Sequence, residues 1–257
     1  MTTGPRPAVL DSDEGRVALV VGGAGGLGPA CCRALANRGM AVIVADLDAQ
    51  GANETAAQLR AEGANAQSAP IDVTDRANVE SFVDRLVHER GRLDVVVNLA
   101  GVIRNALVHK VDDDDFHLVF ATHVVGVLNV MRAAIPHMRS AGYGRLVNTS
   151  SIAVRGSVAG ASYGAAKGAI EGITRSAAME LARHGITANC VAPGLINAGM
   201  FRTVPEDYQR ESLARVPAGR AGEADEVGAC VAFLASSDAS YVTGQTLFVC
   251  GGATLGF

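Results

Sequence analysis

The sequence lacks the marks of a secreted, metal-dependent or membrane-embedded protein. No charged-then-apolar signal pattern opens the chain, and no segment is recognised as long enough to span a membrane. No His or Cys cluster has metal-ligand spacing, so we expect no metal. The five cysteines are odd in number, which favours small buried residues in a reducing compartment: Cys31, Cys32, Cys190, Cys230 and Cys250. A soluble cytoplasmic protein is the default expectation.

Strong charge of one sign is also missing. Twenty-two basic and 26 acidic residues give a net charge of −4, with both signs mixed along the chain. This balance predicts neither a nucleic-acid surface nor an anionic-membrane surface. The 257 residues are 49% hydrophobic, which is enough for one large core. Chains of this length with an α/β pattern are often single domains.

From Arg16 onward, short apolar runs alternate with long amphipathic segments, after a loose tail over residues 1–15. The predicted strands are Val17–Val21, Ala41–Ala45, Ala66–Ile71, Asp94–Val97, Arg145–Thr149, Thr187–Ala192 and Thr246–Val249. The predicted helices include Gly26–Arg38, Asn78–Arg90, Phe116–Arg139 and Ser162–His184. Uniformly apolar strands between helices predict a parallel sheet covered on both faces, in a single domain over 16–257.

One segment interrupts the alternation. Residues 195–220 show no clear strand and are long for a connection in a compact domain. Six large apolar side chains lie in the first part of this segment: Leu195, Ile196, Met200, Phe201, Val204 and Tyr208. We expect a lid with an apolar inner surface.

A glycine-rich turn follows the first predicted strand. Gly22, Gly26 and Gly28, with Leu27 between the last two, lie between that strand and a helical pattern. A turn of this kind lets a pyrophosphate approach the backbone at a helix N-terminus. The spacing is Gly-x-x-x-Gly-x-Gly and not the common Gly-x-Gly-x-x-Gly. An ordinary turn is the alternative, but the strand–turn–helix context favours a dinucleotide site.

Asp46 ends the second predicted strand, about 20 residues after the glycines. A carboxylate at this point of a dinucleotide-binding fold can accept hydrogen bonds from the adenosine ribose hydroxyls. It would repel a 2′-phosphate, and no Arg or Lys follows to bind one. We therefore predict NAD as the cofactor. The alternative is a surface Asp that begins a loop.

Two further strand ends carry candidate cofactor residues. Asp72 and Val73 close the third strand and can border the adenine, although a helix N-cap region is nearly as good an interpretation of Asp72. After the fourth strand, Asn98, Ala100 and Gly101 supply small or polar residues that let a cofactor cross the strand end.

Tyr163 and Lys167 are four residues apart in a predicted helix, so both side chains lie on one face. A phenol has a reference pKa of about 10, and a nearby cation lowers it. The pair could therefore exchange a proton with a substrate hydroxyl or carbonyl near neutral pH. An exposed helical pair is the alternative.

The acidic run over residues 112–115 is interpreted as helix-terminal charge.

Taken in order, these motifs resemble the short-chain dehydrogenase/reductase family. The resemblance runs from about Arg16 to Gly252 and includes Pro193-Gly194 and a Ser-Ser pair before Tyr163. It implies a Rossmann-like fold with seven parallel strands, a homo-oligomer (commonly a tetramer), and hydride transfer between a nicotinamide and a carbonyl or secondary alcohol.

The resemblance also implies roles for individual residues. Tyr163 would be the acid/base, and Lys167 would lower its pKa and hold the nicotinamide ribose. One serine would position the substrate oxygen. We expect Ser151, the second of its pair, although counting thirteen residues back from Tyr163 gives Ser150. Further cofactor contacts are implied for Pro193, Gly194 and Ile196.

The chain departs from the family pattern at four positions. Val21 stands where a Thr is usual, Leu99 replaces the second Asn of Asn-Asn-Ala-Gly, and Ala198 replaces a Thr near the nicotinamide. Most important, His123 stands where the family has an Asn that helps to hold a water relay behind the lysine. His123 is therefore a fourth catalytic candidate, with helix packing as the alternative.

Together these observations predict an NAD-dependent oxidoreductase acting on a secondary alcohol or ketone. The apolar lid suits a substrate with an alicyclic or aromatic body. Two alternatives stay open: a non-catalytic cofactor-binding sensor or structural protein, and an epimerase or dehydratase that uses bound cofactor internally.

Overall fold

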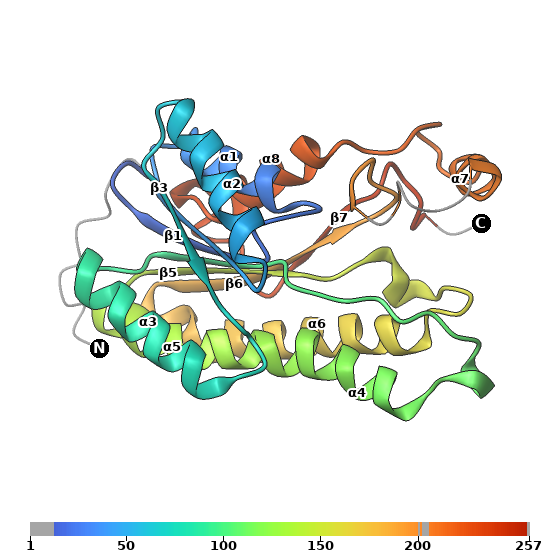
Figure 1. The fold of residues 1–257 in the computed structure, drawn as a ribbon, viewed down its shortest axis with the longest axis horizontal. Coiled ribbons are helices and arrows are strands. Elements are labelled where there is room, and N and C mark those ends of the chain that lie inside the picture. Colours follow the sequence, from blue (N-terminus) through green and yellow to red (C-terminus); the bar gives the residue numbers. More distant parts are fainter. Residues whose placement is uncertain (1–12, 200, 202–205, 256–257) are drawn as a thin grey trace.

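The protein folds into three layers, with a seven-stranded parallel sheet between two layers of helices (Figure 1). The computed structural model describes residues 13–199, 201 and 206–255. The strands are β1 Val17–Val21, β2 Ala41–Asp46, β3 Ala66–Pro70, β4 Val95–Asn98, β5 Gly144–Thr149, β6 Ile186–Pro193 and β7 Thr246–Val249. The predicted Rossmann-like fold with seven parallel strands is confirmed.

The strand order is β3-β2-β1-β4-β5-β6-β7. The chain moves outward from β1 to β3 and then returns to place β4 on the other side of β1. The order reverses between β1 and β4, so their connections leave in opposite directions and open a crevice at the carboxyl ends of the strands. Ligands of such sheets bind in this crevice.

Each face of the sheet carries its own helices. One layer contains α1 Gly28–Ala36, α2 Ala49–Ala61 and α8 Ala224–Leu234. The opposite layer contains α3 Arg76–Arg90, α4 Asp113–Phe120, α5 Gly126–Ala141 and α6 Ala161–Leu181. Helix α7 Glu206–Leu213 lies apart, at one end of the molecule (Figure 1). Short 3-10 turns cover Val108–Lys110, Ile152–Arg155, Ala182–His184 and Ser237–Ala239.

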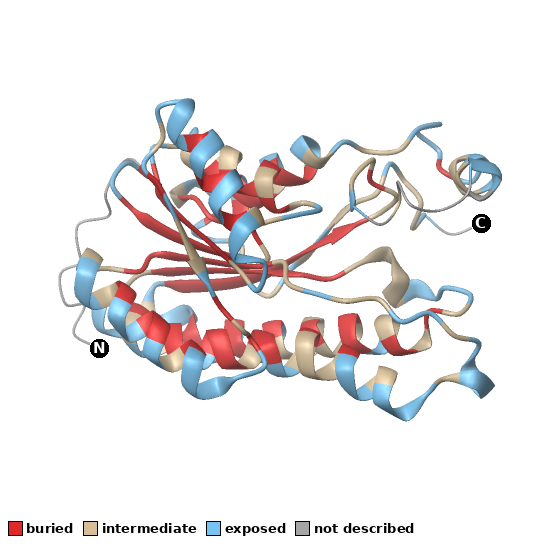
Figure 2. Cartoon of the chain, viewed as in Figure 1, coloured by how far each residue is buried: buried red, intermediate tan, exposed pale blue. Residues whose placement is uncertain are grey.

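The inner strands β1, β2 and β4 are almost wholly apolar because both faces of the sheet are buried there, whereas the edge strands β3 and β7 are partly exposed (Figure 2). In β1, Val17, Leu19 and Val21 contact the layer of α3, α5 and α6. Ala18 and Val20 point the other way, toward α1, α2 and α8. This alternation follows from the two-residue period of a strand.

The predicted strand boundaries agree with the structure to within one residue. The predicted helix Phe116–Arg139 begins earlier, at Asp113, and is interrupted by a π-helical turn at Ala121–Val125. Asp112 caps it by accepting hydrogen bonds from the amides of Asp114 and Asp115, so the acidic run lies at the helix N-terminus as interpreted.

Two further expectations need correction. The tail was assigned to residues 1–15, but Asp13 is buried and its carboxylate binds Arg38 at 2.6 Å, so the folded domain begins before Arg16. The helical run Asp113–Ala141 is long and apolar enough to cross a membrane by length and composition, contrary to our expectation. Half of its apolar window is buried, because α5 packs against the sheet and α3.

Candidate active site

The glycine turn joins β1 to α1 at the crevice. Gly22 has φ +85°, and a Cβ there would lie 2.5 Å from the backbone nitrogen of Ala100. Glycine at this position lets the turn after β1 pack against the loop after β4. Gly26 also has positive φ, and Leu27 precedes α1, whose first residue is Gly28. No side chain caps this helix N-terminus, but the Gly28 amide donates to the Gly25 carbonyl at 2.9 Å and Pro29 has no amide hydrogen, so an anionic group here would be attracted mainly by the helix dipole and the turn before the helix.

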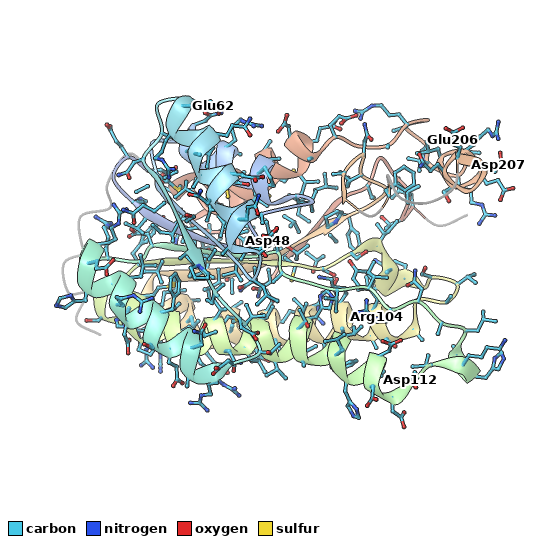
Figure 3. The ribbon with its side chains drawn as sticks, viewed as in Figure 1. Asp48, Glu62, Arg104, Asp112, Glu206 and Asp207 are labelled. Atoms are coloured by element: carbon cyan, nitrogen blue, oxygen red, sulfur yellow. The ribbon has the colours of Figure 1, made fainter. Side chains whose placement is uncertain are left out.

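Asp46 lies beside this turn, at the end of β2. Its Oδ2 accepts a hydrogen bond from the amide of Ala24 at 2.9 Å, and its Oδ1 accepts one from the amide of Asp48 at 3.0 Å. These bonds fix the carboxylate between the glycine turn and the start of α2, near the Asp48 labelled in Figure 3. Leu47, the next residue, is 74% exposed.

Asp72 and Val73 follow β3 on the same side of the sheet. The carboxylate of Asp72 accepts hydrogen bonds from the amide and the hydroxyl of Thr74. Asp75 is the N-cap of α3, and Asp72 lies three residues before it with its amide donating to the Asn78 side chain, so Asp72 belongs to the N-cap region without capping the helix itself. Val73 is buried, and its carbonyl accepts a hydrogen bond from Asn129. Both residues lie where a strand end can border the adenine.

Asn98 ends β4, but its side chain points into the sheet. It donates to Asn148 at 2.8 Å, and Asn148 donates in turn to Thr174 on α6 at 2.9 Å. The side chain of Asn98 therefore links β4, β5 and α6, and any contact with a cofactor would come from its backbone. Ala100 and Gly101 continue past the strand end beside the glycine turn.

The segment after β6 is anchored on both sides. Pro193 ends the strand, and Gly194 packs closely against Cys250, where a Cβ would lie 2.8 Å from the Cys250 Cα. Ile196 is buried and forms an isolated bridge with Gly222. Its side chain packs in the core between β6 and α8, so a cofactor could meet only its backbone. Ala198, the departure from the family Thr, also packs against this core.

Tyr163 and Lys167 lie on the inner face of α6, opposite the end of β5. Ser151 lies close enough to Tyr163 to lower the pKa of its phenol, and the Ser151 Oγ accepts a hydrogen bond from the amide of Ala153 at 3.1 Å. The ammonium of Lys167 donates to the carbonyl of Thr149 at 2.7 Å and lies 5.4 Å from the centre of the Tyr163 ring. The structure therefore brings all three residues together.

Ser150, the alternative active serine, points elsewhere. It is 1% exposed, and its hydroxyl donates to the carboxylate of Glu171 at 2.7 Å. The geometry thus favours Ser151 as the serine that faces Tyr163. Our sequence analysis did not single out Glu171, although it continues the four-residue spacing of Tyr163 and Lys167 along the helix.

Burial controls the protonation of this cluster. It lowers the pKa of Lys167 to about 7, and it raises the pKa of Tyr163 while the hydrogen bond with Ser151 lowers it. The expectation that Lys167 lowers the phenol pKa is not met. An amine whose pKa is about 7 is charged in only part of the molecules at neutral pH, which limits its electrostatic effect.

His123 lies inside this cluster. The ring is 2% exposed and meets the Tyr163 ring edge-on, with 5.4 Å between their centres. Its Nε2 lies 2.8 Å from the carbonyl of Val102 and 3.1 Å from the Val102 amide. Burial and the charge of Lys167 lower its pKa to about 4, so the imidazole is neutral at pH 7.

The approach of His123 requires a glycine opposite. A Cβ on Gly101 would collide with the imidazole Cε1. The π-helical turn Ala121–Val125 places the ring there, between the loop after β4 and helix α6. In the described part of the chain, Nδ1 of this buried ring has no hydrogen-bond partner.

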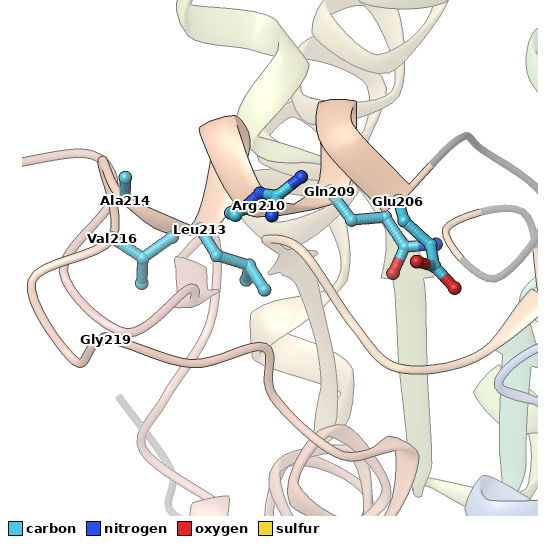
Figure 4. A pocket seen from close by; sticks show the side chains of 7 residues that line it. All are labelled: Glu206, Gln209, Arg210, Leu213, Ala214, Val216 and Gly219. Atoms are coloured by element: carbon cyan, nitrogen blue, oxygen red, sulfur yellow. The ribbon is translucent and has the colours of Figure 1, made fainter.

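The expected lid contains structure that the sequence analysis did not predict. Helix α7 occupies part of it, and a hollow of about 480 Å³ opens beside that helix (Figure 4). The lining residues are Glu206, Gln209, Arg210, Leu213, Ala214, Val216 and Gly219. Tyr163 and Lys167 do not line this hollow, so it does not define the reaction site. Met200 and Val204 and the side chain of Tyr208 lie outside the described residues.

One arginine in the loop after β4 is already paired. Arg104, labelled in Figure 3 near the start of α4, forms an exposed ion pair with Asp115 at 3.0 Å. Within 13–199, 201 and 206–255, no group of three His, Cys, Asp or Glu residues could hold a metal ion.

Comparisons with known proteins agree with this geometry. Residues 22–254 match the family model described as enoyl-(acyl carrier protein) reductase. The chain is 37% identical over 94% of its length to the BbsD subunit of hydroxy(phenyl)methylsuccinyl-CoA dehydrogenase from Thauera aromatica, covering 98% of that protein. It is 39% identical to 3-oxoacyl-acyl-carrier-protein reductase of Salmonella typhimurium, with the same coverage of both proteins.

Solved structures show the same fold. Levodione reductase superposes with a TM-score of 0.91 at 32% identity, over 95% of this chain and 99% of that one. A gluconate 5-dehydrogenase from Burkholderia cenocepacia, solved with NADP and tartrate, gives a TM-score of 0.90 at 35% identity, over 95% of this chain and 97% of that one. The sequence match, the fold and the Ser151–Tyr163–Lys167 cluster together show that this chain belongs to the short-chain dehydrogenase/reductase family of oxidoreductases.

Proposed function

We propose that this protein is an NAD(H)-dependent oxidoreductase that interconverts a secondary alcohol and a ketone. The observation that carries the proposal is the contact of Ser151, Tyr163 and Lys167 at the carboxyl end of β5. Such a cluster holds a hydroxyl oxygen and moves its proton while a nicotinamide, when bound, exchanges the hydride.

The crevice fits a dinucleotide. Gly22 brings the backbone of the turn close to the loop after β4, and the uncapped N-terminus of α1 suits a pyrophosphate. Asp46 would accept hydrogen bonds from the adenosine ribose, with Asp72 and Val73 near the adenine. Neither the turn 22–28 nor the segment 46–49 contains a basic residue that could bind a 2′-phosphate. This set of residues supports NAD over NADP.

Each residue of the cluster has a distinct task. Tyr163 would take the hydroxyl proton during oxidation and return it during reduction. Ser151 would hold the substrate oxygen and stabilise the phenolate, because its hydrogen bond lowers the Tyr163 pKa. Lys167 would hold the nicotinamide ribose, and its pKa of about 7 lets it gain or lose a proton near neutral pH.

His123 would act as a positioning residue in place of the family asparagine. Its contacts with Val102 and the edge of Tyr163 hold the loop after β4 against α6. We propose a substrate with an alicyclic or aromatic body on the apolar residues of the sequence 195–204, although α7 in the same segment is mostly polar, and we propose that 195–220 closes over the site. We also propose a cytoplasmic homotetramer, supported by exposed apolar residues such as Met179 (86% exposed) on α6. Light scattering of the purified protein tests the tetramer.

The decisive test is Tyr163→Phe, which keeps the ring but removes the proton. We expect NADH formation with a panel of secondary alcohols to fall by about 10²–10⁴-fold, with NAD binding retained. Normal turnover by the folded Phe variant would refute the mechanism. Cofactor binding by the wild type without net NADH formation would favour a sensor, and product isomerisation or dehydration without NADH would favour an epimerase or dehydratase.

A further inference from the structure

Two contacts connect the end of β5 to the proposed catalytic side chains of α6. The Thr149 carbonyl accepts a hydrogen bond from Lys167 at 2.7 Å, and Ser151 lies close enough to Tyr163 to lower the pKa of its phenol. The distance between the partners in both contacts depends on the position of α6 along its own axis relative to β5. One helical turn is about 5.4 Å, so even a fraction of a turn would separate these partners.

The residue between these two also binds α6. The Ser150 hydroxyl donates to the Glu171 carboxylate at 2.7 Å, one turn beyond Lys167. Ser150 is 1% exposed, and its amide donates to the Val191 carbonyl on β6 at 2.7 Å. The Glu171 side chain is 15% exposed, and Arg175 lies 3.5 Å away on its solvent side. This contact is therefore a mostly buried, charge-assisted hydrogen bond between a rigid strand end and a helix.

We propose that Ser150 and Glu171 form a positioning pair, which fixes α6 along its axis so that Tyr163 meets Ser151. Neither residue contacts the reacting atoms. Three successive turns of α6 thus contact three consecutive residues at the end of β5, 149–151. The Ser150–Glu171 hydrogen bond holds the helix where the contacts of Tyr163 and Lys167 can form. The inference rests on the proposed function, because it concerns the geometry of that same site.

A purely stabilising pair would behave differently from a positioning pair. Loss of a stabilising bond lowers the melting temperature and leaves kcat unchanged in the folded fraction. Loss of a positioning bond displaces Tyr163 relative to Ser151, and displacements of about 1 Å can cost on the order of 100-fold in rate. Because Ser151 lowers the Tyr163 pKa, its displacement also raises that pKa and moves the pH profile.

The test compares Ser150→Ala, Glu171→Leu, their double variant and the conservative Glu171→Gln, with Arg175→Gln as the control. With the alcohol that the wild type oxidises, we expect each of the first two to lose roughly tenfold in kcat, with KM for NAD and alcohol within about twofold. The double variant should lose no more than either single one, because both remove the same bond. Glu171→Gln, which keeps an acceptor oxygen, and Arg175→Gln should retain most activity.

The pH dependence of kcat provides the second measurement. In Ser150→Ala and Glu171→Leu, the limb that reports deprotonation of Tyr163 should move to higher pH, whereas in Glu171→Gln it should stay. Wild-type kcat and pH profile in folded Ser150→Ala, or losses that multiply in the double variant, would overturn the pairing. An active Tyr163→Phe variant would instead refute the proposed function, so the two failures are distinguishable.

Discussion

Replacement of Lys167 by methionine should inactivate the protein and make it more stable below pH 7. Lys167 is fully enclosed, and burial lowers its pKa from the ordinary 10.5 to about 7. The folded protein therefore disfavours the protonated form of this amine, which lowers the free energy of unfolding wherever the lysine is charged. Met has a similar length and no charge to desolvate, so it removes this cost along with the catalytic amine.

The expected gain follows from the two pKa values. At about 1.4 kcal/mol per pH unit, the difference between 10.5 and about 7 corresponds to roughly 5 kcal/mol. The substitution also leaves the Thr149 carbonyl without its donor, which costs about 1–3 kcal/mol. The net gain below pH 7 is then about 2–4 kcal/mol.

The pH dependence identifies the cause. Between pH 7 and 10.5 the unfolded wild-type chain binds one proton more at this lysine than the folded protein does. The contribution of this lysine to wild-type stability therefore rises with pH by about 1.4 kcal/mol per unit, and the variant lacks this contribution. Its advantage is largest below pH 7 and, falling by about 1.4 kcal/mol per unit, disappears between about pH 8.5 and pH 10. Burial raises the pKa of Cys190 to about 11 and raises that of Tyr163, so these groups also contribute to the pH dependence of stability, but wild type and variant share them and the difference between the two proteins reports Lys167.

Urea unfolding at pH 6, 7, 8 and 9, at one protein concentration, measures the difference. Lys110→Met is a matched control, because the sequence has two lysines and Lys110 is exposed. The control should differ little from wild type at every pH. A Lys167→Met variant that is less stable than wild type at pH 6, or whose advantage does not change with pH, would show that the ammonium is better solvated than its burial implies.

Three other predictions follow from the same site. His123→Asn should keep substantial activity while His123→Leu loses it and remains folded; an active Leu variant with an unchanged pH profile would remove His123 from the mechanism. Wild-type kcat/KM should favour NAD over NADP by at least about tenfold, since like charges 4 Å apart near a surface cost roughly 4 kcal/mol before relaxation, and Asp46→Ser with Leu47→Arg should shift the preference toward NADP. Equal kcat/KM for both cofactors would place Asp46 away from the ribose. Residues 195–220 should gain hydrogen-exchange protection with cofactor and product bound, and equal protection in both states would indicate a static wall.

The fold could be predicted from the sequence because its main signals are local. A strand with both faces buried is largely apolar, and β1 begins and ends with its apolar run. Helix α7 was harder to predict, because its sequence Glu-Asp-Tyr-Gln-Arg-Glu-Ser-Leu is mostly polar and has a weak apolar stripe. The membrane-length run Asp113–Ala141 shows the opposite problem, since a buried core helix and a spanning helix share the same composition.

The site was predicted less completely, because spacing along a helix shows which residues share a face but not what lies opposite. Tyr163, Lys167 and Glu171 form one series with a four-residue period, yet sequence reasoning selected the first two on chemical grounds alone. The partners of the series come from the end of β5 and the residues just after it, where Ser150 and Ser151 both face α6 but meet different turns of that helix. Which serine meets which turn of α6 is decided by the packing of that helix on β5 and β6.

Burial explains why the electrostatic expectation failed while the geometric one succeeded. The sequence indicated a cation beside a phenol, and the structure places Lys167 5.4 Å from the Tyr163 ring. However, the enclosure that brings the two together also disfavours both charges, lowering one pKa and raising the other. The remaining influence that favours the phenolate is a hydrogen bond, from Ser151. The acidity of Tyr163 then depends on the alignment of β5 with α6, so a hydrogen bond remote from the chemistry, such as that of Ser150 with Glu171, can control the rate.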